Sequence, residues 1–188
     1  MTHIRLMRFG VLLLCIFSFF AYALPKTAYA ATETVKAVSN SAGGSTCAIM
    51  TDGSLKCWGN NSFGQLGYDD IVDRGGNTGD VPALAAVNLG TGRTVKMIST
   101  GGRSACAVLD NGTLKCWGFN GDGQLGYDDT TSRGGTAGDM AALGTVFLGV
   151  GRTAKAVSVA DSVNGSHTCA ILDNGKLKCW GFNLSGQL

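Results

Sequence analysis

The chain has 188 residues, among them 29 glycines, 2 prolines and only 15% charged side chains. This composition argues against a disordered chain, and no long stretch of 3.6-residue period indicates a helical bundle. The 15 basic and 13 acidic residues include no basic cluster, which excludes nucleic acid as a partner. The fold class that fits this composition has many short strands joined by glycine-rich turns, so we predict an all-β fold.

The first thirty residues have the pattern of a secretory signal peptide. Arg5 and Arg8 precede an apolar run at 11–24, and Ala28 and Ala30 form a small-x-small cleavage signal. The run is shorter than the roughly 20 apolar residues of a membrane span, and an uncleaved anchor is the alternative. Cleavage would leave 12 basic against 13 acidic residues. We therefore predict a signal peptide at 1–30 and a secreted chain at 31–188, extracellular or periplasmic, without membrane contact after cleavage.

The remaining chain repeats with a period of about sixty residues. The sequence "TVKAVS" at Thr34 returns as "TVKMIS" at Thr94 and as "TAKAVS" at Thr153. This self-similarity predicts repeat units at 34–93 and 94–152 and a truncated third unit at 153–188. The third copy has four extra residues around "VADSVNGSH", which we interpret as a loop.

Each unit contains about four runs with strand character. In the first unit they lie at 35–39, 46–50, 55–58 and 86–89, and an Asp-Gly turn joins the second run to the third. Four antiparallel strands repeated at this spacing are typical of a β-propeller blade, because each small sheet buries its faces against neighbouring blades. Sheets stacked in an open solenoid are the alternative.

Six cysteines follow the leader, in pairs ten residues apart. No C-x-x-C motif occurs, so a secreted chain favours structural disulfides over a metal site, with buried free thiols as the alternative. A three-residue turn with Gly53 in the left-handed conformation would place the two cysteines of a hairpin opposite each other, whereas a two-residue turn would put their sulfurs on opposite faces. The predicted pairs are Cys47–Cys57, Cys106–Cys116 and Cys169–Cys179.

The end of each hairpin carries a family resemblance. The stretches "WGNNSFGQLG" at 58–67, "WGFNGDGQLG" at 117–126 and "WGFNLSGQL" at 180–188 resemble the repeat of the regulator-of-chromosome-condensation family, and "SHTCAILDNGKLKCWG" resembles its hairpin. The resemblance implies a propeller of seven blades, of which this chain would supply about two and a half; it says little about activity. Seven such units would need roughly 400 residues or more, so we expect a fragment that stops at Leu188. An open stack of three units is the alternative.

Three features that look chemical are interpreted as structural. The sequence "GDGQLG" at 121–126 matches the dinucleotide pattern, but no helix is expected after it. His167 stands where the other units have serine, and we expect it to bond a nearby backbone group. The aspartates after each "GQLG" lack the order of a calcium loop, so pairing of Arg74 or Arg133 with an aspartate is favoured over calcium binding. We predict no enzyme, no metal and no cofactor.

Two polar segments, at 68–80 and 127–139, are the predicted contact loops for a protein partner. Tyrosine flanked by aspartates and an arginine suits a protein interface. The leading hypothesis is a secreted protein-binding module, and the resemblance extends to secreted bacterial propellers that inhibit β-lactamases. Guanine-nucleotide exchange, the activity of the family's nuclear founder, and an open self-assembling repeat protein are the alternatives. The candidate contact residues are Tyr68, Asp69, Asp70, Arg74, Tyr127, Asp128, Asp129 and Arg133.

Overall fold

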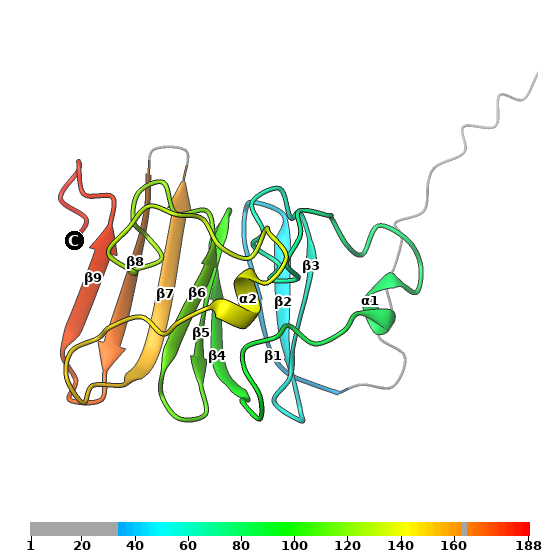
Figure 1. Cartoon of the computed structure of the whole chain (residues 1–188), viewed down its shortest axis with the longest axis horizontal. Coiled ribbons are helices and arrows are strands. Elements are labelled where there is room, and N and C mark those ends of the chain that lie inside the picture. The colour runs from blue at the N-terminus through cyan, green and yellow to red at the C-terminus, as the bar shows by residue number, and fades with distance from the viewer. Residues whose placement is uncertain (1–33, 163–164) are drawn as a thin grey trace, which may run out of the picture.

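A computed structural model describes residues 34–162 and 165–188. They form three antiparallel sheets of three strands, which stand side by side along the longest axis of the molecule (Figure 1). A long loop with one short helix, α1 (Asp80–Ala83) or α2 (Asp139–Ala142), follows the first and the second sheet. The strands are β1 (Val35–Asn40), β2 (Ser45–Met50), β3 (Leu55–Gly59), β4 (Val95–Thr100), β5 (Ser104–Leu109), β6 (Leu114–Gly118), β7 (Ala154–Ser162), β8 (Gly165–Leu172) and β9 (Leu177–Gly181).

The sheets fan out from their first strands. β1 contacts β4 and β4 contacts β7, whereas β3, β6 and β9 lie at the opposite edges of their sheets. Side chains join the converging strands, because the hydroxyls of Ser39 and Thr100 lie 2.9 Å apart and Ser99 Oγ accepts the Val159 N–H at 3.0 Å. This is the arrangement of neighbouring β-propeller blades, as the sequence predicted.

Each sheet contains three strands where the sequence predicted four. The fourth run, at 86–89, lies beside β3 and is joined to it by the bond from Val87 N–H to Leu55 O, at 2.8 Å. One bond does not make a ladder, although Val87 and Leu89 still place buried side chains in the core. The run therefore packs like an outer strand without pairing along its length.

The β2–β3 hairpin has the three-residue turn that the cysteine spacing requires. Gly53 has a φ of 84°, and the Met50 N–H donates to Ser54 O at 2.9 Å. Cys47 consequently stands opposite Cys57, which confirms the predicted register. The other two hairpins have the same alignment. The structure brings both sulfur atoms to bonding distance in Cys47–Cys57, Cys106–Cys116 and Cys169–Cys179.

The hydrophobic core lies between the sheets. Leu55 of the first sheet, 1% exposed, shares one buried cluster with Leu109 of the second. Leu114, on the face of the second sheet that corresponds to the face of Leu55, shares the next cluster with Val157 of the third sheet. Since each core is built by two consecutive units, each unit depends on its neighbour for stability.

The extra residues of the third unit lengthen a hairpin, so the loop prediction was wrong. β7 extends to Ser162 and β8 begins at Gly165, with these two residues opposite each other. The insertion pairs across the hairpin because its residues continue both strands. The longer β7 carries Asp161 next to Arg103 of the second unit.

The predicted signal peptide at 1–30 lies outside the described residues. Within residues 34–162 and 165–188, no helix is long and apolar enough to cross a membrane. The boundaries of the leader and of the secreted chain stay predictions.

Candidate partner-binding surface

An ion pair holds the first predicted contact loop in one conformation. The Arg74 guanidinium binds both carboxylate oxygens of Asp70, at 2.8 and 2.7 Å, and lies 4.3 Å from the centre of the Tyr68 ring. Asp70 also accepts the Val72 N–H at 3.0 Å and an N–H of the buried Asn61 side chain at 3.1 Å. The hydrogen bonds from Arg74 lower the pKa of Asp70, so the pair stays charged and fixes the loop backbone.

The tyrosines of both loops tether them to the sheets. The Tyr68 hydroxyl accepts the Cys57 N–H and donates to Ala85 O, both at 3.1 Å. The Tyr127 hydroxyl accepts the Cys116 N–H at the same distance. Burial raises the pKa of both phenols, that of Tyr127 to about 12. Both hydroxyls thus have bonding partners within the chain.

The second loop repeats the ion pair of the first. Arg133 Nη2 lies 2.7 Å from Asp129 Oδ2, and the guanidinium lies 4.4 Å from the centre of the Tyr127 ring. The hydrogen bonds from Arg133 lower the pKa of Asp129 to about 2. The predicted pairing of Arg74 and Arg133 with aspartates is confirmed.

Asp69 joins the first unit to the second. It has a left-handed backbone, with a φ of 61°, and its Oδ1 accepts the Met140 N–H in α2 at 2.7 Å. Helix α2 accordingly lies next to the first sheet (Figure 1). Asp128, with a φ of 59°, holds the same position in the second unit, and its carboxylate is exposed. Asp69 therefore makes a contact between units, and its counterpart faces solvent.

The most exposed apolar side chains of the first loop are Ile71 and Val72, at its tip. Their side chains are 62% and 61% exposed. In sequence they lie between Asp70 and Arg74, the two residues whose ion pair closes the turn. Sequence reasoning emphasised the charged neighbours and missed these two residues. Comparing the units could have found them, because the second unit has Thr130 and Thr131 there.

An aromatic patch adjoins this loop. Phe63, 39% exposed, meets the Phe119 ring edge-on, with 5.3 Å between the ring centres. The Arg103 guanidinium lies 4.5 Å from the centre of the Phe119 ring and pairs at 2.9 Å with Asp161, whose side chain is 2% exposed. Phe63, Arg103 and Asp161 line part of a hollow of about 700 Å³, together with Gly43. The patch gives the surface an apolar floor beside a fixed charge pair.

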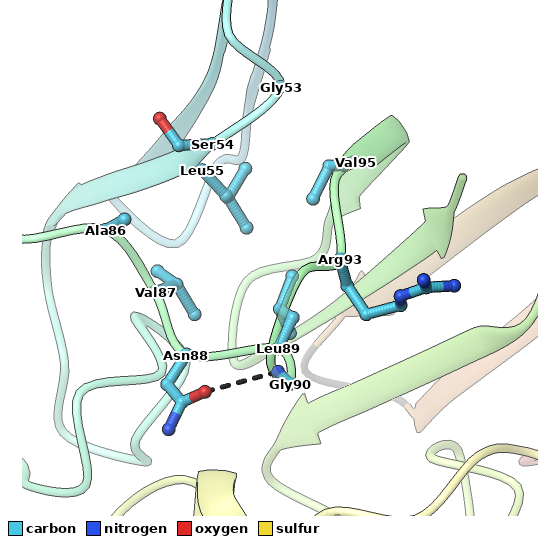
Figure 2. Close-up of a pocket in the computed structure, with 10 residues that line it drawn as sticks. All are labelled: Gly53, Ser54, Leu55, Ala86, Val87, Asn88, Leu89, Gly90, Arg93 and Val95. Atoms are coloured by element: carbon cyan, nitrogen blue, oxygen red, sulfur yellow. Dashed lines mark hydrogen bonds between the residues drawn. The ribbon is translucent and has the colours of Figure 1, made fainter. Parts of the chain in front are cut away.

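A second cavity, of about 320 Å³, lies at the seam between the first two sheets (Figure 2). Its apolar wall consists of Leu55, Val87, Leu89 and Val95, which are at most 6% exposed and belong to the core. Arg93 is the titratable residue of the lining, and Figure 2 shows its guanidinium pointing away from the cavity. These side chains offer packing contacts and no acid, base or nucleophile for catalysis.

The remaining sequence motifs occupy structural positions. Residues 121–126 form a turn that continues into a loop, with no helix beginning at Gly126, so they lack the geometry of a dinucleotide site. His167 stands opposite Gly181 in the third hairpin. Its imidazole makes no hydrogen bond within the described chain, so the expected bond to the backbone was wrong. No group of three or more metal-ligating side chains occurs among those same residues.

Known proteins share both the repeat and the fold. The chain is 28% identical over 182 residues to the ultraviolet-B receptor UVR8 of Arabidopsis thaliana, covering 75% of this chain and 40% of the receptor. It is 28% identical over 141 residues to the human probable E3 ubiquitin-protein ligase HERC3, covering 75% of this chain and 12% of the ligase. The chain therefore spans less than half the length of these relatives.

Solved structures support the propeller fold. Human WBSCR16 superimposes with a TM-score of 0.59 at 19% identity, over 81% of this chain and 35% of that protein. Prp20p of Saccharomyces cerevisiae superimposes with a TM-score of 0.57 at 21% identity, over 79% and 33%. The regulator of chromosome condensation (RCC1) repeat matches residues 41–65, 95–124 and 162–187, one stretch in each sheet region. With the repeat and the blade arrangement in agreement, the chain carries RCC1 repeats in a propeller-type fold.

Proposed function

We propose that the chain is a protein-binding module that works outside the cytosol. The observation that carries this proposal is the pair of exposed apolar side chains, Ile71 and Val72, on a loop fixed by an ion pair. Single exposed apolar residues are common on protein surfaces, whereas exposed apolar residues that lie together mark interaction sites. Inhibition of a secreted enzyme is one form that this function would take.

The rigidity of the loop favours binding, because ordering a flexible loop costs affinity. The bidentate bond between Arg74 and Asp70 fixes the turn before a partner arrives. Ile71 lies close to Gly135 of the second loop, which in turn packs against Gly64. Phe63 immediately precedes Gly64 in the chain. The exposed apolar side chains of the loop and those of the aromatic patch therefore lie on one side of the molecule.

Aspartate in place of both tip residues tests this surface. The double variant I71D/V72D should bind a partner at least about 30-fold more weakly than the wild type, as expected for residues at the centre of an interface. The matched control is T130D/T131D, which introduces the same charges at the equivalent tip of the second unit. Both variants and the wild type are immobilised and exposed to the secreted proteins of the source culture.

A protein retained by the wild type and by T130D/T131D, but lost with I71D/V72D, would support the proposal, and its affinity is then measured by calorimetry. Equal retention by all three chains would contradict it.

The cysteine pairs support an extracytoplasmic location, because disulfides persist in oxidising compartments. Each pair, such as Cys47 and Cys57 with their Cα atoms 4.1 Å apart, lies at bonding distance. We expect thiol titration of the secreted chain, under denaturing and non-reducing conditions, to find no free thiol among the six cysteines. Six reactive thiols would contradict this expectation.

A further inference from the structure

One set of lysines differs from the arginines in its contacts. Three lysines at the same position of the three units, Lys36, Lys96 and Lys155, are exposed and have no hydrogen bond or ion pair within residues 34–162 and 165–188. Each arginine in that part of the chain, in contrast, pairs with an aspartate. The pairs are Arg74–Asp70, Arg93–Asp110, Arg103–Asp161, Arg133–Asp129 and Arg152–Asp173.

Each of the three lysines occupies a β-bulge. The pairing of β1 with β2 skips Lys36, and the first strands of the other two sheets skip Lys96 and Lys155 in the same way. A bulge redirects its side chain out of the regular alternation of the strand. The three lysines therefore share one local geometry as well as one sequence position.

The fold brings the three bulges together at one end of the molecule. β1, β4 and β7 are edge strands and they converge. In each unit the threonine two residues before the lysine accepts a backbone bond from the hairpin turn, as Thr34 O does from the Thr51 N–H at 3.0 Å. The lysines consequently form a row across the converging strands, at the end of the molecule where the hairpin turns lie.

The charges around this row leave it positive. Arg93 and Arg152, at the same end, are neutralised by Asp110 and Asp173, at 3.3 and 3.1 Å. Asp52 is the acidic residue of the first hairpin turn, and it accepts the N–H of the nearby Ser54. The three ammonium groups thus face solvent. The described hairpin turns add the exposed Lys176 and one carboxylate outside an ion pair, that of Asp52.

We propose that Lys36, Lys96 and Lys155 form a docking row for an acidic, extended segment of a partner protein. A small anion would meet one or two of these groups, since each belongs to a different sheet. An extended segment with several carboxylates would meet all three. Exposed ion pairs contribute little individually, so affinity at such a row comes from their number and depends strongly on salt.

Lysines at bulged edge strands also prevent unwanted strand pairing. That role alone predicts self-association when the lysines are replaced and no affinity for an acidic peptide. The docking row predicts such affinity, so one binding experiment distinguishes the two roles. It also distinguishes this row from the surface around Ile71 and Val72, which lies on the long loops of the molecule.

The experiment measures the fluorescence anisotropy of a labelled ten-residue glutamate peptide with the full secreted chain at low ionic strength. The wild type should bind, and about ten times the salt should weaken binding at least about tenfold. The variant K36E/K96E/K155E should lose at least about tenfold in affinity, and each single reversal about threefold. The control T130D/T131D adds two negative charges on the second long loop, away from the hairpin turns, and should bind like the wild type, as should I71D/V72D.

Several results would overturn the proposal. They are no binding by the wild type, equal binding by the triple variant, or an equal loss with T130D/T131D. Binding of a heparin oligosaccharide without binding of the glutamate peptide would also overturn it, because the row would then serve a polysaccharide. If the triple variant loses its circular dichroism spectrum, the three single reversals decide the question.

Discussion

Replacement of Trp117 by alanine should lower the free energy of unfolding by about 3–5 kcal/mol. The indole is fully buried, and its Nε1–H donates to Gln65 O of the first unit at 3.0 Å. The substitution would open a cavity between two sheets and leave a buried carbonyl without its donor. Urea unfolding followed by circular dichroism measures the loss.

Trp58 offers the matched control, because it holds the same position in the first unit. Its side chain is only partly buried, and it has no such bond to another unit within the described chain. Trp58→Ala should therefore cost less than half as much as Trp117→Ala. Equal losses would show that the contact between units is not the source of the effect.

Replacement of Gly64 by alanine should destabilise the contact between the two long loops by about 3 kcal/mol. Gly64 has a φ of 75°, and a Cβ there would lie 2.4 Å from Gly135 N and 2.5 Å from Gly134 C. These are backbone atoms of the second loop, which cannot rotate away. The cost combines left-handed strain of about 1–2 kcal/mol with overpacking of about 1–3 kcal/mol. Thermal unfolding and amide exchange of the second loop measure it.

Gly123 separates the two contributions, because its φ of 73° is nearly the same. A Cβ there would have Asp129 O, at 3.8 Å, as its nearest neighbour. Gly123→Ala should therefore cost only the left-handed strain, about 1–2 kcal/mol. If both variants lose the same stability, close packing between the loops contributes nothing.

Much of the fold follows from local sequence signals. The ten-residue cysteine spacing and Gly53 together determine the turn length, and the turn length determines which residues share a face. The sixty-residue period then implies a stack of similar sheets. The sequence could not show whether residues 86–89 pair as a strand. An apolar run has the same pattern whether or not its backbone N–H and C=O groups form hydrogen bonds with a neighbouring strand.

The roles of the loop residues depend on contacts that no local pattern encodes. Tyr68 and Asp70 have the composition of an interface, yet their polar atoms bind the backbone and Arg74 of the same loop. Arg103 and Asp161 are separated by 58 residues and lie in different positions of their units. Asp161 lies in the part of β7 that extends beyond the length of β4, so this contact depends on a hairpin length that the repeat does not specify.

The tryptophan bonds have a consequence for how such a chain can be altered. Trp117 donates to the main-chain oxygen of Gln65, and Trp180 donates to that of Gln124 at 2.9 Å. The junction between successive units is therefore recognised through a peptide group, which every amino acid supplies. A unit that keeps its own tryptophan could therefore follow any other unit in a rearranged or duplicated gene. The hydrogen bond between the two units would form even if the accepting residue had mutated to another amino acid.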